Sequence, residues 1–156
     1  MDTLTQAQND TIKARALYEV DFYQWVFHNA DLLRQGRFAE IDLENIIEEL
    51  EGMARRDRRE LLSRLAVLIM HLLKWQYQPK RRGESWSTTI HNQRTDIELL
   101  LADSPSLKHN IEIVIVNGFI TAKRGFEKET GISANTLPDA CPYIFEQLMD
   151  HDFWPE

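Results

Sequence analysis

The sequence is poor in cysteine, glycine and proline, and each scarcity excludes something. A single cysteine, Cys141, among 156 residues allows no intramolecular disulfide and no cysteine-based zinc site. An unpaired thiol is ordinary in a reducing compartment, so we expect a cytoplasmic protein. Six glycines and five prolines leave long stretches in which no residue interrupts a helix.

Long apolar runs are absent as well. The longest one, residues 65–73, is interrupted by His71 and is too short to span a bilayer. The first sixteen residues contain no apolar core of signal-peptide length. The net charge of -7 argues against a general phosphate-binding surface. We therefore expect a soluble protein with no membrane partner.

The apolar residues that are present follow a helical period. No stretch alternates between apolar and polar residues as a half-buried strand does. The pattern predicts an all-α fold, a single-domain helical bundle of five or six helices over residues 17–156, after a polar lead-in over residues 1–16. Residues 60–77 are apolar almost all the way round, which predicts a buried central helix.

Capping signals place the first helices. Asp21 with Gln24 has the form of a capping box, so a helix is expected over residues 22–35, ended by Gly36. Asp42 suits the N-cap of the next helix. That helix has an apolar stripe made of Leu43, Ile46, Ile47, Leu50, Met53 and Ala54 and a solvated acidic side made of Glu44, Glu48 and Glu51.

The continuity of this helix is open. Asp57 with Glu60 forms another possible capping box, which favours a break near residues 55–57. A single bent helix that runs on to Trp75 explains the pattern nearly as well.

Later boundaries follow from serines and prolines. Ser85 or Ser87 caps a fourth helix, and a fifth runs from Pro105 to about Thr130. A short last helix begins at Pro142. The tail "FWP" is expected to fold back onto the bundle, because its aromatic rings favour burial.

Two ionisable residues stand out on the central helix. Arg64 and His71 are seven residues apart, nearly two helical turns, and so project from one face. A guanidinium there needs acidic partners or an open cleft. If the preceding helix packs alongside, Glu48 and Glu49 are candidate partners.

The Arg-x6-His spacing resembles the Arg-x4–6-His motif of HEPN domains, helical bundles that often act as metal-independent ribonucleases. The resemblance implies that Arg64 binds phosphate and that His71 acts on the ribose hydroxyl or the leaving oxygen. Leu65 departs from it, since a polar residue usually follows the arginine in that family. A structural Arg–His–Glu network and a binding cleft of unknown purpose are the alternatives.

Metal and nucleic-acid sites also have weak signals. His28, His71 and His91 lie on separate expected helices, but no two ligands show a metal-binding spacing within one helix. We predict no metal and no cofactor. The "KRRGESW" loop places three basic residues next to Trp86, a combination that could hold a phosphate and stack a base, although such loops are commonly only solvated.

Taken in order, the segments "LYEVDFYQW", "GRFAEIDLENIIEELEGM", "LIMHLLKWQYQP", "SWSTTIHNQR", "DSPSL" and "CPY…DFWP" resemble the bacterial domain-of-unknown-function family numbered twenty-nine, from about residue 17 to 155. The resemblance implies a compact helical domain and no established activity. Polar residues that are unusual for a packing core mark where a site would lie: Asp21, Glu48, Glu49, Arg64, His71, Lys74, Gln76, Gln78, Trp86 and Arg94.

The function expected first is a non-enzymatic interaction or regulatory module, with a protein partner favoured over nucleic acid. The candidate binding residues are Glu48, Glu49, Lys74, Trp86 and Arg94. One alternative is a HEPN-like ribonuclease or RNA-binding domain that uses Arg64 and His71, and a third is a metal-dependent helical-bundle enzyme. The sequence leaves open whether the chain is an enzyme and whether it associates with itself.

Overall fold

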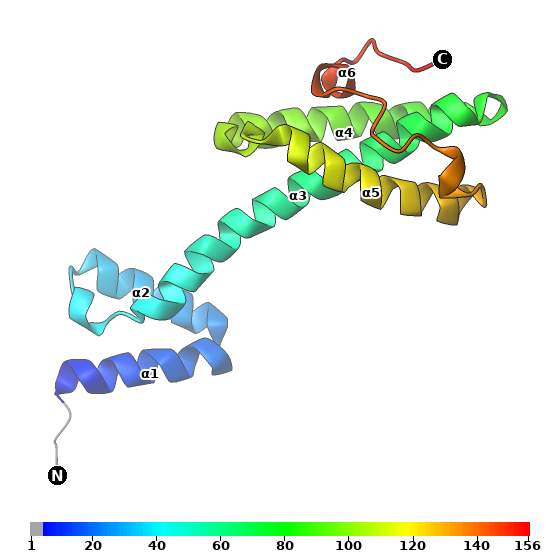
Figure 1. The fold of residues 1–156 in the computed structure, drawn as a ribbon. Coiled ribbons are helices and arrows are strands. Elements are labelled where there is room, and N and C mark those ends of the chain that lie inside the picture. Colours follow the sequence, from blue (N-terminus) through cyan, green and yellow to red (C-terminus); the bar gives the residue numbers. More distant parts are fainter. Residues whose placement is uncertain (1–4) are drawn as a thin grey trace. The chain divides into compact units, whose positions relative to one another are not determined.

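The computed structural model describes residues 5–156, with only the backbone described at residue 14 (Figure 1). The described residues form helices and turns and contain no strand, which confirms the all-α prediction. The α-helices are α1 (Gln6–Val20), α2 (Phe22–Arg34), α3 (Leu43–Tyr77), α4 (Glu84–Asp103), α5 (Ile111–Thr130) and α6 (Phe145–Met149).

The chain groups into two compact units, the first ending at Ala54 and the second spanning Arg55–Glu156. The helix α3 contributes its first part to the N-terminal unit and the rest to the C-terminal unit. The predicted domain boundary at residue 17 stays a prediction, and the first four residues of the predicted lead-in lie outside the described part of the chain.

In the N-terminal unit, α1 occupies most of the stretch expected to be a polar lead-in. Thr5 begins it with a capping box, in which Thr5 and Gln8 bond to each other's backbone N–H groups. Asp21 caps α2 as expected, since its Oδ1 accepts the backbone N–H of Gln24 at 3.0 Å. Gly36 follows α2 with φ +69°, the left-handed conformation that glycine adopts without strain.

The open question about a break near residues 55–57 is settled in favour of one helix. α3 is continuous over 35 residues. Residues 55–60, "RRDRRE", are mostly strong helix formers, and no proline occurs within α3. The potential cap at Asp57 is therefore overridden by helix propagation on both sides.

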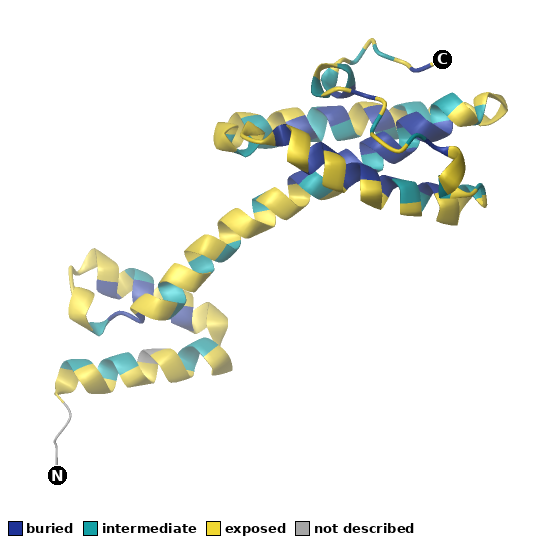
Figure 2. Cartoon of the chain, viewed as in Figure 1, coloured by how far each residue is buried: buried dark blue, intermediate teal, exposed yellow. Residues whose placement is uncertain are grey.

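The core of the C-terminal unit surrounds the second part of α3, as predicted. Figure 2 shows buried residues along this part and along the facing sides of α4 and α5. Fully buried side chains on α3 are Leu61, Leu65, Leu68, Ile69, Leu72 and Leu73, and they meet Ile90 and Ile97 of α4 and Phe126 of α5. Apolar contacts on nearly every side explain the missing polar face.

One predicted cap and two predicted helix starts are wrong. α4 begins at Glu84, within the expected segment, but its N-cap is the extended Gly83 rather than Ser85 or Ser87. The predicted fifth helix is divided, because Pro105–Lys108 forms a 3-10 turn and the left-handed Asn110 (φ +57°) separates it from α5. The last helix begins at Phe145 instead of Pro142, after the buried Tyr143 donates its hydroxyl to Gln76 at 2.7 Å.

The C-terminal tail folds back onto the bundle, as expected from its aromatic residues. The ring of Trp154 lies 4.5 Å from that of Trp75, and Phe153 packs edge-on against Tyr143 at 5.9 Å. Figure 1 shows α6 and the tail on the α4 side of this unit, where α6 contacts both α4 and α5. Among the described residues, no helix has the length and apolarity needed to cross a membrane.

Candidate functional site

Arg64 lies in an ion cluster between α3 and α4. Its Nε donates to Glu60 at 2.9 Å, one turn earlier on α3, and its Nη1 donates to Asp96 of α4 at 2.8 Å. The side chain is 30% exposed, so water reaches the cluster. Two carboxylates flank one guanidinium, which means that the arginine's charge is already balanced.

Two surface grooves meet at Arg64. One, of about 490 Å³, is lined by Arg56, Arg59, Glu60, Ser63, Arg64, Val67 and Gln93. The other, of about 360 Å³, is lined by Asp57, Glu60, Arg64, Asp96, Leu99, Leu100, Asp103 and Ser104. Because guanidinium groups outnumber carboxylates in the first groove, it is suited to an anion, whereas the second is acidic.

His71 has different partners from Arg64. Its Nδ1 lies 2.9 Å from the carbonyl oxygen of Val67, so Nδ1 carries the proton and donates it. Burial lowers the pKa of His71, and the neighbouring Lys74 lowers it further, while the Val67 bond and Glu129 oppose these effects. His71 does not line either groove at Arg64. Joint chemistry by the two residues stays a prediction.

The expected acidic partners of Arg64 were the wrong ones. Glu48 and Glu49 lie on the same continuous helix as Arg64, rather than on a separate helix packed beside it. Glu49 instead accepts the hydroxyl of Tyr18 at 2.6 Å in the N-terminal unit, and this bond is the main reason that the pKa of Tyr18 is raised. Glu48 is exposed on the same turn of α3.

Lys74 and Trp86, two of the candidate binding residues, lie in contact. Lys74 is 8% exposed, and its Nζ lies 4.7 Å from the centre of the Trp86 ring. The same Nζ pairs with Glu129 of α5 at 2.7 Å. The charge of the buried ammonium is stabilised by the aromatic face and the carboxylate. These three residues therefore connect α3, α4 and α5.

Arg94 is a fully buried anchor for the C-terminal segment. Its Nε donates to the carbonyl of Leu148 at 2.7 Å, and its Nη2 donates to those of Gln147 and Phe153. The guanidinium also lies 5.8 Å from the centre of the Trp154 ring. Burial lowers the pKa of Arg94, with Asp150 and Glu98 opposing the effect. These contacts give Arg94 a structural role.

The basic loop that follows α3 is tied to the protein through Arg82. Its Nε donates to the carbonyl of Trp75 at 2.8 Å, and its guanidinium lies 5.4 Å from the centre of the Trp75 ring. Trp86, the predicted stacking platform for a base, already faces Lys74. The loop thus contacts one aromatic ring of its own protein, that of Trp75.

The apolar stripe predicted on the first part of α3 lies largely in solvent. Leu43 is 56% exposed and Leu50 is 62% exposed, and Ile47 and Met53 are also exposed. Only Ile46 of the larger side chains is half-buried. Figure 2 shows mainly exposed residues along this part of the helix. The N-terminal unit is therefore organised by a different set of contacts.

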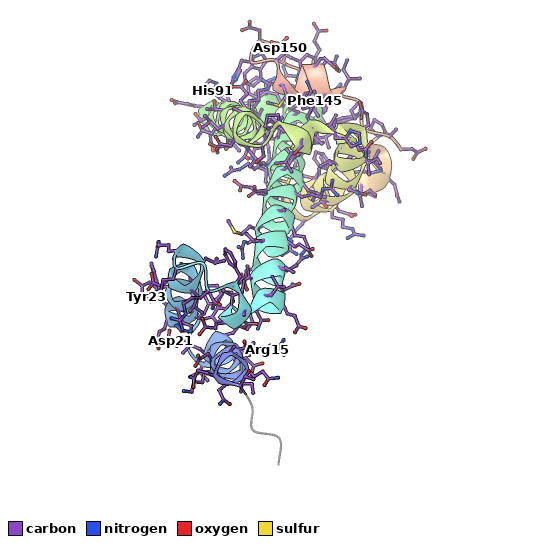
Figure 3. All side chains as sticks on the ribbon, turned by 90° about the vertical axis from the view of Figure 1, so that its left-hand side faces the viewer. Arg15, Asp21, Tyr23, His91, Phe145 and Asp150 are labelled. Atoms are coloured by element: carbon purple, nitrogen blue, oxygen red, sulfur yellow. The ribbon has the colours of Figure 1, made fainter. Side chains whose placement is uncertain are left out.

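A buried polar cluster that sequence reasoning missed organises this unit. Asp42 is fully buried, and its carboxylate accepts from the indole of Trp25 at 3.0 Å and from Asn45 at 2.7 Å. Asn29 accepts the backbone N–H of Asp42 at 2.9 Å, and Arg15 approaches the carboxylate at 3.7 Å. Figure 3 labels Arg15 on α1 in this unit. Asp42 was recognised from its capping signal alone.

The structure also brings together His91, His151 and Glu98. His91 and Glu98 are seven residues apart on α4, a spacing that places them on one face of the helix. This spacing is the one sequence signal that could have indicated the group. His151 is distant in sequence, which is why the group was missed. Of the three histidines weighed for a metal, only His91 belongs to it. No three histidine, cysteine or acidic side chains within residues 5–156 form a complete metal site.

Comparison with known families shows which family the chain belongs to. The family described as "Domain of unknown function DUF29" matches residues 17–154. The chain belongs to this family. This confirms the resemblance seen in the sequence, and it assigns DUF29 membership without assigning an activity. No curated protein and no solved structure matches the chain.

Proposed function

We propose that this DUF29 chain is a cytoplasmic, non-enzymatic interaction module that binds a basic amphipathic helix of a partner protein. The observation that supports this proposal most directly is the exposed apolar stripe on the first part of α3, defined here as Leu43, Ile47 and Leu50. At 100° per residue these side chains lie within about 60° of one another around the helix, so they form one continuous face. A groove in the partner is not required, because two apolar helix faces pack against each other directly.

Charge indicates the partner's chemistry. Residues 1–54 contain eleven acidic and four basic residues, which gives them a net charge of -7. Residues 55–156 contain fourteen of each and are neutral overall. Glu44, Glu48 and Glu51 follow one edge of the stripe at helical spacing, and Glu44 is already paired with Arg15 at 3.0 Å. A partner helix with Lys or Arg beside its apolar residues complements this edge, whereas a second copy would present the same acidic edge.

A defined probe tests the proposal. A helical Leu/Lys peptide is titrated into the full chain, and affinity is measured by fluorescence anisotropy. We expect Ile47→Ser with Leu50→Ser to weaken binding about tenfold or more, because apolar burial is lost. The matched control is Ile113→Ser with Val116→Ser, two apolar residues on α5 that are also about half-exposed. A Leu/Glu peptide should not bind. Equal losses in the two double variants, or equal binding of the acidic peptide, would refute the proposal.

The physiological partner is then sought with a photo-crosslinking residue at position 47 and, as control, at position 113. Support requires a crosslinked peptide from another protein, with basic residues beside a helical apolar stripe. A crosslink to a second copy of this chain would show that the stripe is a self-association face, and would overturn the partner class.

The second candidate function is RNA binding or cleavage at the larger groove, which its three guanidinium groups favour. A labelled single-stranded RNA should bind more weakly to Arg56→Ala and Arg59→Ala than to the control Arg82→Ala. If Arg64 and His71 carry out cleavage, Arg64→Ala and His71→Ala should each abolish it. Cleavage that persists in both variants excludes this pair.

A further inference from the structure

Two histidines from distant parts of the chain point their ring nitrogens at each other. His91 lies on the exposed side of α4 (Figure 3), and His151 follows α6 in the sequence. The two Nδ1 atoms are 3.0 Å apart, and the ring centres are 4.7 Å apart with the ring planes at 61°. Neither residue takes part in the apolar stripe or in the grooves at Arg64.

These two separations fit a symmetric arrangement in which the two ring axes converge. Because each nitrogen lies about 1.15 Å from its ring centre, axes that meet symmetrically converge about 2.0 Å beyond each Nδ1, close to the metal–imidazole distance of about 2.0–2.1 Å. With nitrogens 3.0 Å apart, the angle at the meeting point is about 94°. This is near the right angle of square-planar and octahedral complexes and below the tetrahedral angle preferred by structural zinc.

Glu98 supplies the support that a metal-binding histidine needs. Its Oε1 lies 2.9 Å from Nε2 of His151, so Nε2 carries the proton and donates it to the carboxylate. In neutral His151, Nδ1 then presents its lone pair to His91. A carboxylate that holds the outer ring nitrogen orients the ring and makes the inner nitrogen a better ligand.

We propose that His91 and His151 bind a divalent transition-metal ion, Cu²⁺ or Ni²⁺, through their Nδ1 atoms, with Glu98 as a positioning residue. Without the metal, His91 donates its Nδ1 proton to His151. With the metal, this proton moves to Nε2 of His91 and the freed lone pair binds the ion. Water completes the coordination, since no third ligand from the described residues converges on the point.

Such a site would tie the C-terminal segment to α4. His151 belongs to the segment that Arg94 already holds through the carbonyls of Gln147, Leu148 and Phe153. A metal bound to His91 and His151 would add a second, solvent-exposed contact between α4 and this segment, next to the buried Arg94 contacts. Binding should therefore slow local opening of residues 145–156, because the ion binds only while the segment is docked.

The test uses the full-length, untagged chain titrated with Cu²⁺ from a glycine buffer, which suppresses weak sites. We expect one Cu²⁺ per chain and an electron paramagnetic resonance spectrum with two coordinated imidazole nitrogens. His91→Gln and His151→Gln should each lower affinity about tenfold or more, and Glu98→Gln about tenfold. His28→Gln and His109→Gln are the controls, since both residues are exposed and lie outside the group.

Hydrogen exchange gives a second readout. Cu²⁺ should slow exchange over residues 145–156 in the parent and in the His28 and His109 variants, but not in the His91 or His151 variants, all with unchanged far-ultraviolet circular dichroism. Parent-like copper affinity in both His91→Gln and His151→Gln, or an equal loss in the controls, would overturn the proposal. A parent chain that binds no Cu²⁺ would show that the contact is only a hydrogen bond.

Discussion

The indole N–H of Trp25 donates to the buried carboxylate of Asp42 at 3.0 Å, and this bond joins α2 to the residue immediately before α3. The carboxylate accepts from Asn45 as well, and the backbone N–H of Asp42 is held by Asn29. A fully buried carboxylate is stable only with such partners. The arrangement in the N-terminal unit therefore depends on polar contacts more than on its exposed apolar stripe.

Replacing Asp42 by alanine should destabilise this unit by about 2–3 kcal/mol, because buried donors lose their acceptor. The measurement is native-state hydrogen exchange over residues 22–34. Asp31→Ala is the control: its pair with Arg34 is exposed, and its loss should cost less than about 1 kcal/mol. Equal effects of the two substitutions would contradict a special role for Asp42.

Replacing Arg94 should release the C-terminal segment. Arg94→Ala removes donors to three backbone carbonyls, and hydrogen bonds to a charged group are worth about 1.5–3 kcal/mol each in mutational series. We expect faster proteolysis after residue 144 and a loss of at least about 2 kcal/mol in the free energy of unfolding. Arg94→Lys should rescue this only in part, because an ammonium lacks the planar fork. Parent-like proteolysis of Arg94→Ala would refute the anchoring role.

His71 should make stability depend on pH below neutrality. Its folded-state pKa is lowered by burial, so the unfolded chain binds more protons between the folded value and the ordinary value of about 6.5. The stabilising contribution of neutral His71 is present above about pH 6.5 and is lost as the pH falls through the lowered pKa.

The comparison is the urea midpoint of the parent and of His71→Gln between pH 7.5 and 5. We expect the difference between the two proteins to shift in favour of the variant as the pH falls. His109→Gln should show no such trend, because His109 is exposed. A constant difference between parent and His71→Gln would contradict the prediction.

The Lys74–Glu129 pair should respond asymmetrically to substitution. Glu129→Gln leaves a nearly buried ammonium without its carboxylate and should cost about 1–2 kcal/mol, since water reaches the half-exposed Glu129 side. Lys74→Met removes the buried charge, keeps most of the volume beside Trp86, and should cost less. Thermal unfolding of both single variants measures this. A larger loss in Lys74→Met would show that the contact with Trp86 dominates.

The helical parts of the fold were predictable because their signals are local. Asp21 and Gly36 bracket α2 through capping contacts made within a few residues. The central helix was evident because its apolar residues surround the helix axis. The start of α5 was not evident, since the left-handed turn at Asn110 competes with a proline signal at Pro105 that is favourable for either a helix or a 3-10 turn.

The candidate site was predicted less well. Sequence reasoning selected Lys74, Trp86 and Arg94 as unusual polar or aromatic residues in an apolar setting, and each has a close partner in the structure. It assigned Glu48 and Glu49 to Arg64 as acidic partners. Because α3 is continuous, these glutamates lie on the same helix as Arg64, and Asp96 of α4 pairs with it instead. The apolar stripe on the first part of α3 was predicted, but its exposure was not, since periodicity shows that a face is apolar and not what covers it.

By itself, the sequence determined the all-α class, the central helix and the DUF29 family, because helical period, capping and segment order are written along the chain. The tertiary structure alone decided that Asp42 meets Trp25, that Arg94 holds the tail, and that His91 faces His151. These contacts join residues far apart in sequence. Their formation depends on how helices dock, and docking is set by the whole core rather than by any local pattern.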